Sequence, residues 1–162
     1  MQPYSSPALE NRLVIEQATW RDLNAVRAVE RACFDDDAWP LFDLIAALTF
    51  PDVVRLKAVL DGQMVGFAGG DIRHNQKLGW ITTLGVLPEF RRMGIASALL
   101  EASEEALGQP RVRLCVRRSN TGAIRLYDKY GYQQVGVWPS YYEDREDAFV
   151  MEKNITVIKE KT

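Results

Sequence analysis

The sequence is poor in the residues that bind metals and form redox centres. Its 162 residues include two cysteines, Cys33 and Cys115, and one histidine, His74. Two cysteines far apart in the chain give neither a disulfide framework nor the spacing of a metal site. A zinc site, a histidine cluster and a cysteine–histidine nucleophile with a separate orienting group are therefore not expected, and no metal is predicted. Any chemistry has to come from carboxylates, tyrosines, backbone amides and water.

Long apolar runs and a large net charge are missing as well. No run approaches the ~20 apolar residues that a helix needs to cross a bilayer. The formal net charge is −2, so the bulk charge gives no reason to expect nucleic acid or a membrane surface as a partner. The first residues, MQPYSSPALENR, lack the basic start and the apolar stretch of a signal peptide. With so few cysteines, these features predict a cytoplasmic protein, either a monomer or a homodimer.

What remains is the composition of one ordinary globular domain. Hydrophobic residues make up 47% and charged residues 26% of a chain whose length suits a single core. The sequence has no internal repeat, no low-complexity tract and no composition shift that would mark a linker. We therefore predict a single domain over residues 11–155, between an N-terminal tail at 1–10 and a C-terminal tail at 156–162.

Apolar periodicity and turn signals predict an alternation of strands and helices. Strands are expected at residues 11–18, 53–60, 63–70, 78–86, 111–116, 132–138 and 148–153, and helices are expected to begin at about residues 19, 40, 92 and 121. Asp61-Gly62, between two strand-like runs, is a strong hairpin signal. Three antiparallel strands followed by a strand–helix–strand crossover predict an α/β fold with a mixed sheet.

Two of the predicted helices carry more specific expectations. Thr19, with Asp22 in the first turn that follows, is close to a capping box. The helix from about Arg92 to Leu107 is expected to bury four apolar side chains and to turn three glutamates to solvent. The expected buried residues are Ile95, Leu99, Ala102 and Ala106, and the expected exposed glutamates are Glu101, Glu104 and Glu105.

One short stretch, Arg91-Arg92-Met93-Gly94-Ile95-Ala96, lies between an apolar strand and an alanine-rich helix. A helix N-terminus leaves backbone N–H groups unpaired and carries a partial positive charge, so it attracts anions. Gly94 has no side chain to block these amides, and the two arginines supply forked donors that suit phosphate. The alternative interpretation is two solvated arginines before a turn glycine. The stretch predicts a pyrophosphate site, and the lack of a Walker A loop and of a Gly-x-Gly-x-x-Gly motif makes coenzyme A the ligand that it suggests.

The same stretch resembles the Arg/Gln-x-x-Gly-x-Gly/Ala signature of the GNAT superfamily of N-acetyltransferases. Further along, Arg118-Ser119-Asn120 and the run from Ala123 to Tyr132 resemble the second signature of that family, S-N-x-x-A-x-x-L-Y-x-K-x-G-F. The likeness extends from about Leu13 to Lys153 and includes the predicted order of elements. It implies the GNAT fold, in which a mixed, mostly antiparallel central sheet of about seven strands is flanked by about four helices.

Two further stretches resemble particular branches of this superfamily. Ser140-Tyr141-Tyr142 and the following Arg145–Ala148 are similar to the end of bacterial ribosomal-protein alanine N-acetyltransferases, whereas Ile81–Val86 is more like the matching strand of protein N-terminal acetyltransferases. The resemblance implies acetyl-CoA-dependent transfer to a primary amine, with a protein N-terminal α-amine as the leading acceptor, by direct transfer in a ternary complex. Two alternatives stay open. One is acetylation of a small amine such as a polyamine, an amino acid or an antibiotic, and the other is a coenzyme-A-binding module with weak catalysis.

The resemblance also assigns residues to acetyl-CoA. Leu84, Gly85 and Val86 would pair with the pantetheine arm and polarise the thioester carbonyl. The pyrophosphate would be held at Arg91, Arg92, Met93, Gly94, Ile95, Ala96 and Ser97. Asn120 would contact the cofactor, and Tyr127 would lie near its sulfur and protonate the departing thiolate. Core packing is the alternative for Tyr127, and helix capping is an alternative or additional role for Asn120.

The acceptor would bind between two walls. Tyr141 and Tyr142 would form one of them, although exposed surface aromatics are the alternative. Phe34, with Trp39 or Phe42, would form the other, and Trp80 occupies a position where certain N-terminal acetyltransferases carry a tyrosine. The acidic run at residues 35–37 is interpreted as a solvated loop in preference to a site for a cationic N-terminus.

The general base is the least defined part of the predicted site. Cys115 occupies a position where ribosomal-protein acetyltransferases carry a glutamate and certain N-terminal acetyltransferases carry a histidine. It is either a base with an ordinary pKa of ~8.5 or, as an alternating residue of a strand, a small buried filler. Glu143, Asp147 and His74 are the remaining candidates. A chain of waters could also suffice, because an α-amino group is only weakly basic, with a pKa of about 7.7–8.0.

Overall fold

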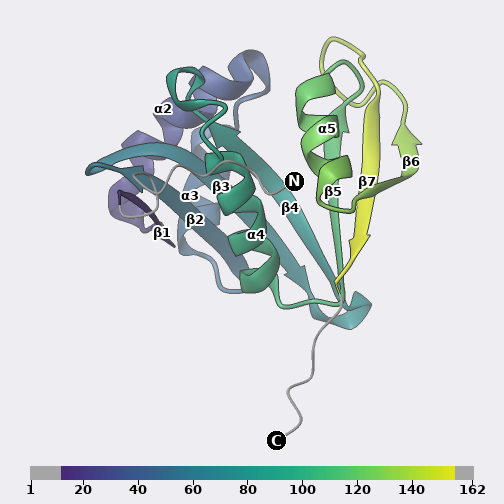
Figure 1. Cartoon of the computed structure of the whole chain (residues 1–162), viewed down its shortest axis with the longest axis horizontal. Helices are drawn as coiled ribbons and strands as arrows, with labels where there is room; N and C mark the ends of the chain where they lie inside the picture. The colour runs from purple at the N-terminus through teal and green to yellow at the C-terminus, as the bar shows by residue number, and fades with distance from the viewer. Residues whose placement is uncertain (1–11, 156–162) are drawn as a thin grey trace, which may run out of the picture.

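The computed structural model describes residues 12–155 of the chain. Within this range seven strands form one sheet, in the order β1-β2-β3-β4-β5-β7-β6 (Figure 1). The strands are β1 (Leu13–Gln17), β2 (Val53–Leu60), β3 (Gln63–Arg73), β4 (Leu78–Val86), β5 (Arg111–Arg117), β6 (Gln133–Trp138) and β7 (Ala148–Asn154). The α-helices are α2 (Leu23–Phe34), α3 (Leu41–Thr49), α4 (Ile95–Leu107) and α5 (Thr121–Lys129). Neighbouring strands are antiparallel except β4 and β5, so the predicted α/β class, element order and mixed sheet are confirmed. The tails predicted at 1–10 and 156–162 lie outside the described residues.

Two predicted local motifs form at the start of the chain. The β2–β3 hairpin turns at Asp61 and Gly62, whose φ angles are 50° and 80°. A type I′ turn needs positive φ at both positions, which glycine adopts without strain. The capping box also forms, because the Asp22 carboxylate accepts the Thr19 backbone N–H at 2.8 Å. This box closes a short 3-10 turn, η1 (Trp20–Asp22), from which α2 continues.

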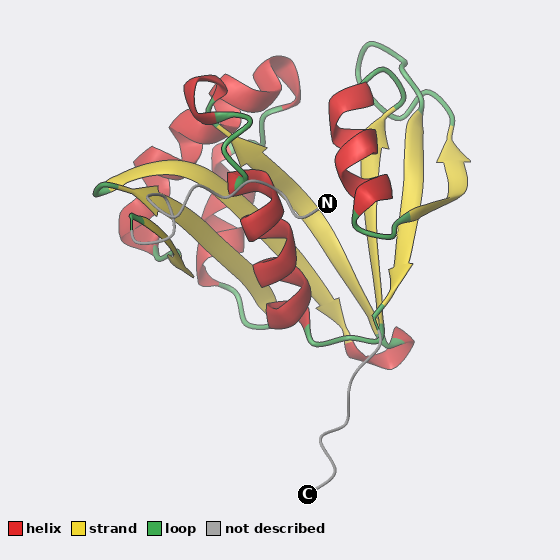
Figure 2. Ribbon diagram, in the orientation of Figure 1, coloured by secondary structure: helices red, strands yellow, loops and turns green. Residues whose placement is uncertain are grey.

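Helices cover both faces of the sheet (Figure 2). α2 and α3 lie on one face, which we call the α2/α3 face, and α4 and α5 lie on the other, which we call the α4/α5 face. On the α2/α3 face, Val26, Val29 and Leu44 pack with Phe67 of the sheet. On the α4/α5 face, Leu100 packs with side chains from β5, α5 and β7. None of the helices among residues 12–155 is both long and apolar enough to span a membrane.

Helix α4 confirms the predicted burial of Ile95 and Leu99 but not that of the two alanines. Its buried side chains are Ile95, Leu99, Leu100, Ser103 and Leu107. Ala102 is only partly buried and Ala106 is exposed, so their predicted burial is wrong. Leucine side chains bury more apolar area than alanine methyl groups, and the sheet leaves room for Leu107: a Cβ at Gly79 would lie 3.0 Å from it.

Glu104 is not turned to solvent either. Its carboxylate accepts the Tyr132 hydroxyl at 2.8 Å and the Lys153 ammonium at 3.0 Å, which ties α4 to β7 and to the residue before β6. The predicted exposure of Glu104 is wrong because helical periodicity does not reveal partners that come from distant strands. Burial, and after it the charge of Glu104, raises the pKa of Tyr132, so its hydroxyl remains a donor.

Replacing Glu104 with alanine should lower the free energy of unfolding by about 2 kcal/mol, because the change leaves a buried hydroxyl and a largely buried ammonium without their partner. Denaturant-induced unfolding measures this loss. Glu105→Ala, at an exposed position of the same helix, is the matched control and should stay within about 0.5 kcal/mol of the parent. A loss for Glu104→Ala no larger than that of the control would contradict a stabilising role for this cluster.

The sheet opens between β4 and β5. The two strands pair in parallel over four residues each, ending at Ile81 and Leu114. The next residue, Thr82, is an extra residue in the pairing of β4 with β3, and a bulge of this kind bends its strand and increases the local twist. Beyond the bulge β4 stays paired with β3 as far as Val86, but it diverges from β5 toward the carboxyl ends of both strands (Figure 1).

Candidate active site

A cleft of about 780 Å³ lies between the diverging ends of β4 and β5. Its walls come from α2 and the segment after it, from β4 and β5, from α5, and from the end of β6 and the loop that follows. The predicted site residues that line this cleft are Phe34, Trp80, Leu84, Cys115, Asn120, Tyr127, Tyr141 and Tyr142. The fold therefore gathers side chains that are distant in the sequence around one cavity.

The predicted pyrophosphate stretch forms a tight turn that leads into α4. Arg92 and Gly94 have φ angles of 62° and 81°. The first backbone hydrogen bond of the helix runs from the Ala98 N–H to the Gly94 carbonyl at 3.1 Å. The N–H groups of residues 95–97 consequently have no partner within the helix, and no side chain in the described part of the chain caps them. A Cβ at Gly94 would meet no atom within 4 Å, so the turn is open to a ligand, and its free amides and helix dipole suit a diphosphate.

The two arginines of this turn are placed differently. Arg91 turns back toward the sheet, where its Nε donates to the Val86 carbonyl at 3.2 Å and its guanidinium lies beside the Cys33 thiol. Arg92 is exposed. Arg91 therefore fixes the turn to the end of β4, while Arg92 is the arginine that can reach an anion in front of the helix.

Asn120 and Tyr127 line the cleft from the α5 side. The Asn120 side chain accepts the Ala123 N–H at 3.2 Å, so the capping role that the sequence allows is confirmed. Tyr127 is 7% exposed and packs with Leu114 and Val116, yet it borders the cleft. Burial raises the pKa of Tyr127 to about 12. The phenol therefore stays protonated at neutral pH, where it can act as a donor but not as a base.

A continuous row of aromatic rings lies on the other side of the cleft. Trp80 stacks on Trp138 with ring centroids 5.7 Å apart. Trp138 contacts Tyr141 at 5.2 Å, and Tyr141 contacts Tyr142 edge-on at 5.1 Å. Ile81 packs into the core of the α4/α5 face, and side chains alternate along a strand, so Trp80 points to the α2/α3 face. The sequence did not single out Trp138, which completes this row.

Residues 16–132 of the chain match the model of the acetyltransferase (GNAT) family. The chain belongs to this family. It is 34% identical over 148 residues to the N-terminal acetyltransferase A complex catalytic subunit NAA10 of Arabidopsis thaliana, a match that covers 87% of the chain and 77% of that relative. It is 31% identical over 151 residues to the N-alpha-acetyltransferase of Sulfurisphaera tokodaii, covering 85% of the chain and 90% of the relative. Its structure superposes on the ribosomal-protein-S18-alanine N-acetyltransferase of Escherichia coli with a TM-score of 0.82 and 26% identity, over 93% of this chain and 98% of that one. The superfamily and fold that the motifs predicted are confirmed, and the chain is an N-acetyltransferase.

Arg117 closes one end of the cleft in this GNAT domain. Its guanidinium is paired with Asp37 of the short turn η2 (Asp35–Asp37) and with Asp144 and Glu146 of the loop between β6 and β7. It also lies 4.0 Å from the ring centroid of Tyr142. The expectation that the acidic run is a solvated loop is therefore wrong for Asp37. We call this set of ion pairs the Arg117 brace, because it joins the segment after α2 to the loop after β6.

Of the four residues that the sequence offers as candidate general bases, two line the cleft and two do not. Burial raises the pKa of Cys115 to about 11, so its thiol is protonated at neutral pH, and it packs beside Trp80. The raised pKa and the packing favour the interpretation that Cys115 has a packing role and is not the general base. Glu143 is part of the cleft lining, whereas His74 and Asp147 are not.

A buried glutamate that the sequence analysis missed borders the same cleft. Glu30 of α2 is 1% exposed, and its Oε1 accepts the Thr83 hydroxyl at 2.6 Å. Its Oε2 is buried and has no hydrogen-bond partner among residues 12–155, which costs about 1–3 kcal/mol for a buried polar group. A signal was available in the sequence, because Glu30 lies four residues after Val26 and three before Cys33, within the apolar stripe of its helix.

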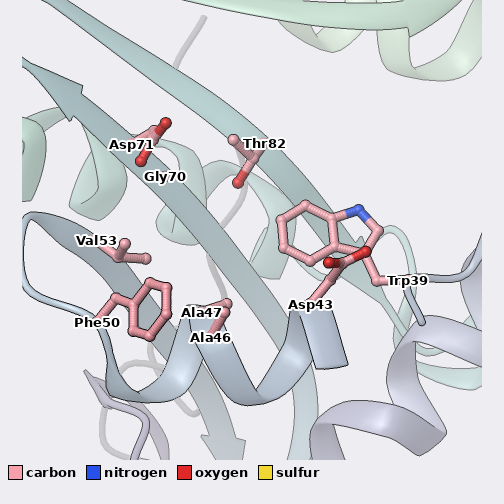
Figure 3. Close-up of a pocket in the computed structure, with 9 residues that line it drawn as sticks. All are labelled: Trp39, Asp43, Ala46, Ala47, Phe50, Val53, Gly70, Asp71 and Thr82. Atoms are coloured by element: carbon pink, nitrogen blue, oxygen red, sulfur yellow. The ribbon is translucent and has the colours of Figure 1, made fainter. Parts of the chain in front are cut away.

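A smaller groove of about 310 Å³ adjoins the cleft between α3 and the sheet (Figure 3). Trp39 and Thr82 line both cavities, and the groove also presents Phe50 and the carboxylates of Asp43 and Asp71. Phe34 and Trp39, predicted as the second wall of the acceptor site, both border the cleft; the side chain of Phe42 lies outside what the structure describes. The α2/α3 face therefore offers more room than a single amine-bearing group would need.

Proposed function

We propose that this GNAT enzyme transfers the acetyl group of acetyl-CoA to the α-amine of a protein N-terminus, by direct attack in a ternary complex. The observation that carries the proposal is the cleft, which α5 borders on one face of the sheet and the aromatic row borders on the other. A donor and an acceptor can enter from opposite faces and meet between β4 and β5. The names of the relatives, which describe acetyltransferases of N-terminal amines, support the same acceptor.

On the α4/α5 face, the chain's own groups fit the donor. The free N–H groups of residues 95–97 would bind its pyrophosphate, and Arg92 would add a positive charge. Within residues 12–155, β4 has no partner strand on its β5 side beyond the bulge, so the backbone of residues 84–86 would pair with the pantetheine arm as a neighbouring strand would. Asn120, at the N-terminus of α5, would contact the same arm.

Tyr127 is proposed to protonate the thiolate sulfur of the coenzyme A leaving group. The amine nitrogen attacks the thioester carbonyl carbon, the C–N bond forms, and the C–S bond breaks with its electron pair on sulfur. Tyr127 donates its hydroxyl proton to that sulfur, and burial keeps the phenol protonated until then. General acid catalysis of this kind typically contributes ~10²–10⁴ in rate.

On the α2/α3 face, the shape of the site favours an extended backbone as the acceptor. Tyr141 and Tyr142 form one wall and Phe34 forms part of the other. The Arg117 brace joins the two walls, which we expect to keep the space between them narrow. An extended peptide N-terminus would fit between these walls, and the groove beneath α3 would give space for the side chains that follow.

Activity on defined amines tests this proposal. Purified protein is supplied with acetyl-CoA and, in turn, with short peptides that have a free α-amine, the same peptides with a blocked N-terminus and one lysine, and free amines such as spermidine and single amino acids. We expect release of coenzyme A with the unblocked peptides and, by mass spectrometry, an acetyl group on their first residue.

Activity confined to the free amines would overturn the protein acceptor and leave the acetyltransferase assignment standing. Modification of lysine in the blocked peptides at the rate of the unblocked ones would overturn the preference for an α-amine. Binding of acetyl-CoA without transfer to any of these amines would contradict the proposed reaction itself.

A further inference from the structure

Glu30 is the charged side chain in the core of the part of the chain that the structure describes. The other buried polar side chains there are hydroxyl groups, Thr83 and Ser103. Ser103 satisfies its hydroxyl within its own helix, by donating to the Leu99 carbonyl at 2.6 Å. Glu30 accepts the Thr83 hydroxyl at Oε1, and its Oε2 makes no hydrogen bond among residues 12–155, although the Trp39 backbone N–H lies close enough to the carboxylate to affect its pKa. A carboxyl group in this condition, beside a cleft, is typical of a functional residue.

The position of this pair relates it to the acceptor and not to the donor. Thr83 directly follows the bulge at Thr82, where β4 begins to diverge from β5. It points to the α2/α3 face, as does Gly85, at which a Cβ would lie 2.9 Å from the Cys33 sulfur of α2. Glu30 and Thr83 both line the cleft. They therefore lie on the face from which the amine is proposed to enter, whereas Tyr127 lies on the face of the donor.

The surroundings of Glu30 leave it free to exchange a proton. Burial raises its pKa, and the Thr83 hydroxyl and the Trp39 backbone N–H, which favour the charged form, oppose this shift. On its own helix, Cys33 lies three residues after Glu30 and interacts with it electrostatically, and burial also raises the pKa of the Cys33 thiol.

The basic groups on the neighbouring elements have other partners, Arg73 among them, which lies over the Trp80 ring, while Glu143 is a further carboxylate in the cleft lining. Arg91, from the turn before α4, is held by the Val86 carbonyl and lies beside Cys33. Across the cleft, Arg117 and Asp37 are paired with each other. None of these groups occupies the free oxygen of Glu30.

We propose that Glu30 takes up the proton that the acceptor ammonium must lose before it attacks, with the Thr83 hydroxyl as the relay; this inference rests on the proposed function. An N–H bond of the ammonium breaks as that proton binds the Thr83 oxygen, and the hydroxyl proton of Thr83 moves to Glu30 Oε1. The amine then carries a free electron pair and attacks the carbonyl carbon.

The remaining protons balance. The nitrogen loses a second proton as the amide forms, and that proton returns through water to Tyr127, which has given its own to sulfur. The proton on Glu30 leaves to solvent after the product departs. The acetylated nitrogen keeps one hydrogen, and the net reaction releases one proton for each ammonium consumed.

Glu30→Gln tests the inference, because glutamine keeps the shape and the hydrogen bond from Thr83 but cannot accept a proton. The variant can therefore acetylate only amine molecules that are already neutral. For an α-amine of pKa ~7.8, the neutral fraction is about one-twentieth at pH 6.5 and about four-fifths at pH 8.5. With the best acceptor from the screen above and saturating acetyl-CoA, we expect kcat to fall about tenfold at pH 6.5 and less than about threefold at pH 8.5. The KM for acetyl-CoA should stay the same.

Three further variants separate proton transfer from packing. Thr83→Val removes the relay and should repeat the pH-dependent loss, whereas Thr83→Ser keeps the hydroxyl and should remain within about threefold of the parent at both pH values. Glu101→Gln, exposed on α4, is the matched control for loss of a carboxylate and should change nothing.

Two results would overturn the inference. An active enzyme in which Glu30→Gln loses the same factor at both pH values, or loses nothing, would show that Glu30 serves only packing. Retention of the parental pH profile by Thr83→Val would exclude the relay. Failure of the unaltered protein to acetylate any amine would instead contradict the proposed function, so the two failures are distinguishable.

Discussion

Tyr127→Phe should lower kcat about a hundredfold while the Kd for acetyl-CoA stays within about threefold of the parent. The substitution removes one hydroxyl group from a ring that is otherwise held by the core, where it packs with Leu114 and Val116. A group that acts only as the C–S bond breaks contributes to kcat and not to binding, and loss of a general acid typically costs ~10²–10⁴ in rate. Initial rates over a range of acetyl-CoA concentrations, with calorimetry for the Kd, measure both quantities.

The pH dependence supplies a second readout for Tyr127. Because burial raises its pKa to about 12, the phenol is protonated throughout pH 6–9, so Tyr127→Phe should scale the rate by the same factor over that range. Tyr130→Phe, also on the α5 segment but outside the cleft lining, is the control and should remain active. Equal losses in kcat and in acetyl-CoA affinity would show that Tyr127 serves binding or packing and not proton donation.

Gly94→Leu should weaken acetyl-CoA binding at least a hundredfold. A leucine here would place its side chain in the open space beside the free amides of residues 95–97. Hydrogen bonds to a charged group contribute about 1.5–3 kcal/mol each, and each 1.4 kcal/mol corresponds to about tenfold in Kd. Displacement of the diphosphate from two of these amides is therefore enough for the expected loss, which calorimetric titration with acetyl-CoA measures.

Backbone strain is the competing explanation for any effect at Gly94, and the chain offers a matched control. Gly62 in the β2–β3 turn has a φ of 80°, against 81° for Gly94, and a Cβ there also meets nothing within 4 Å. Leucine in the left-handed conformation costs about 1–2 kcal/mol at either position. Gly62→Leu should thus show a similar loss of stability with an unchanged Kd. If both variants bind acetyl-CoA as the parent does, the turn before α4 is not the pyrophosphate site.

The elements that the sequence predicted well are those whose signals are local. The Asp-Gly turn between β2 and β3 and the capping box at Thr19 depend on residues at most three apart, and both form as expected. The motif around Gly94 likewise depends on a helix start and a glycine next to it. In α4 the periodicity located the helix and the burial of Ile95 and Leu99, but not the burial of Leu107 or the pairing of Glu104, because their partners lie in distant segments that the helix itself does not specify.

The acceptor side of the site was predicted less completely, for the same reason. Tyr141, Tyr142 and Trp80 were identified, but Trp138 joins them only because β6 and β4 bring two distant rings together. The sequence predicts a solvated acidic run because nothing near it shows that Arg117 would reach Asp37. The role of each of these residues in catalysis stays a prediction until the amines and variants above are tested.

The sequence by itself determined the order of strands and helices, the family and the glycine turn before α4, since turn residues, apolar periods and motif spacings act over a few residues. Only the tertiary structure decided where β4 and β5 part, which rings line the gap, and that Glu30 meets Thr83, a partner 53 positions away. The sequence does not show whether a glutamate is buried or exposed. The packing of α2 against the bulged strand is what removes water from Glu30 and leaves one of its oxygens without a partner.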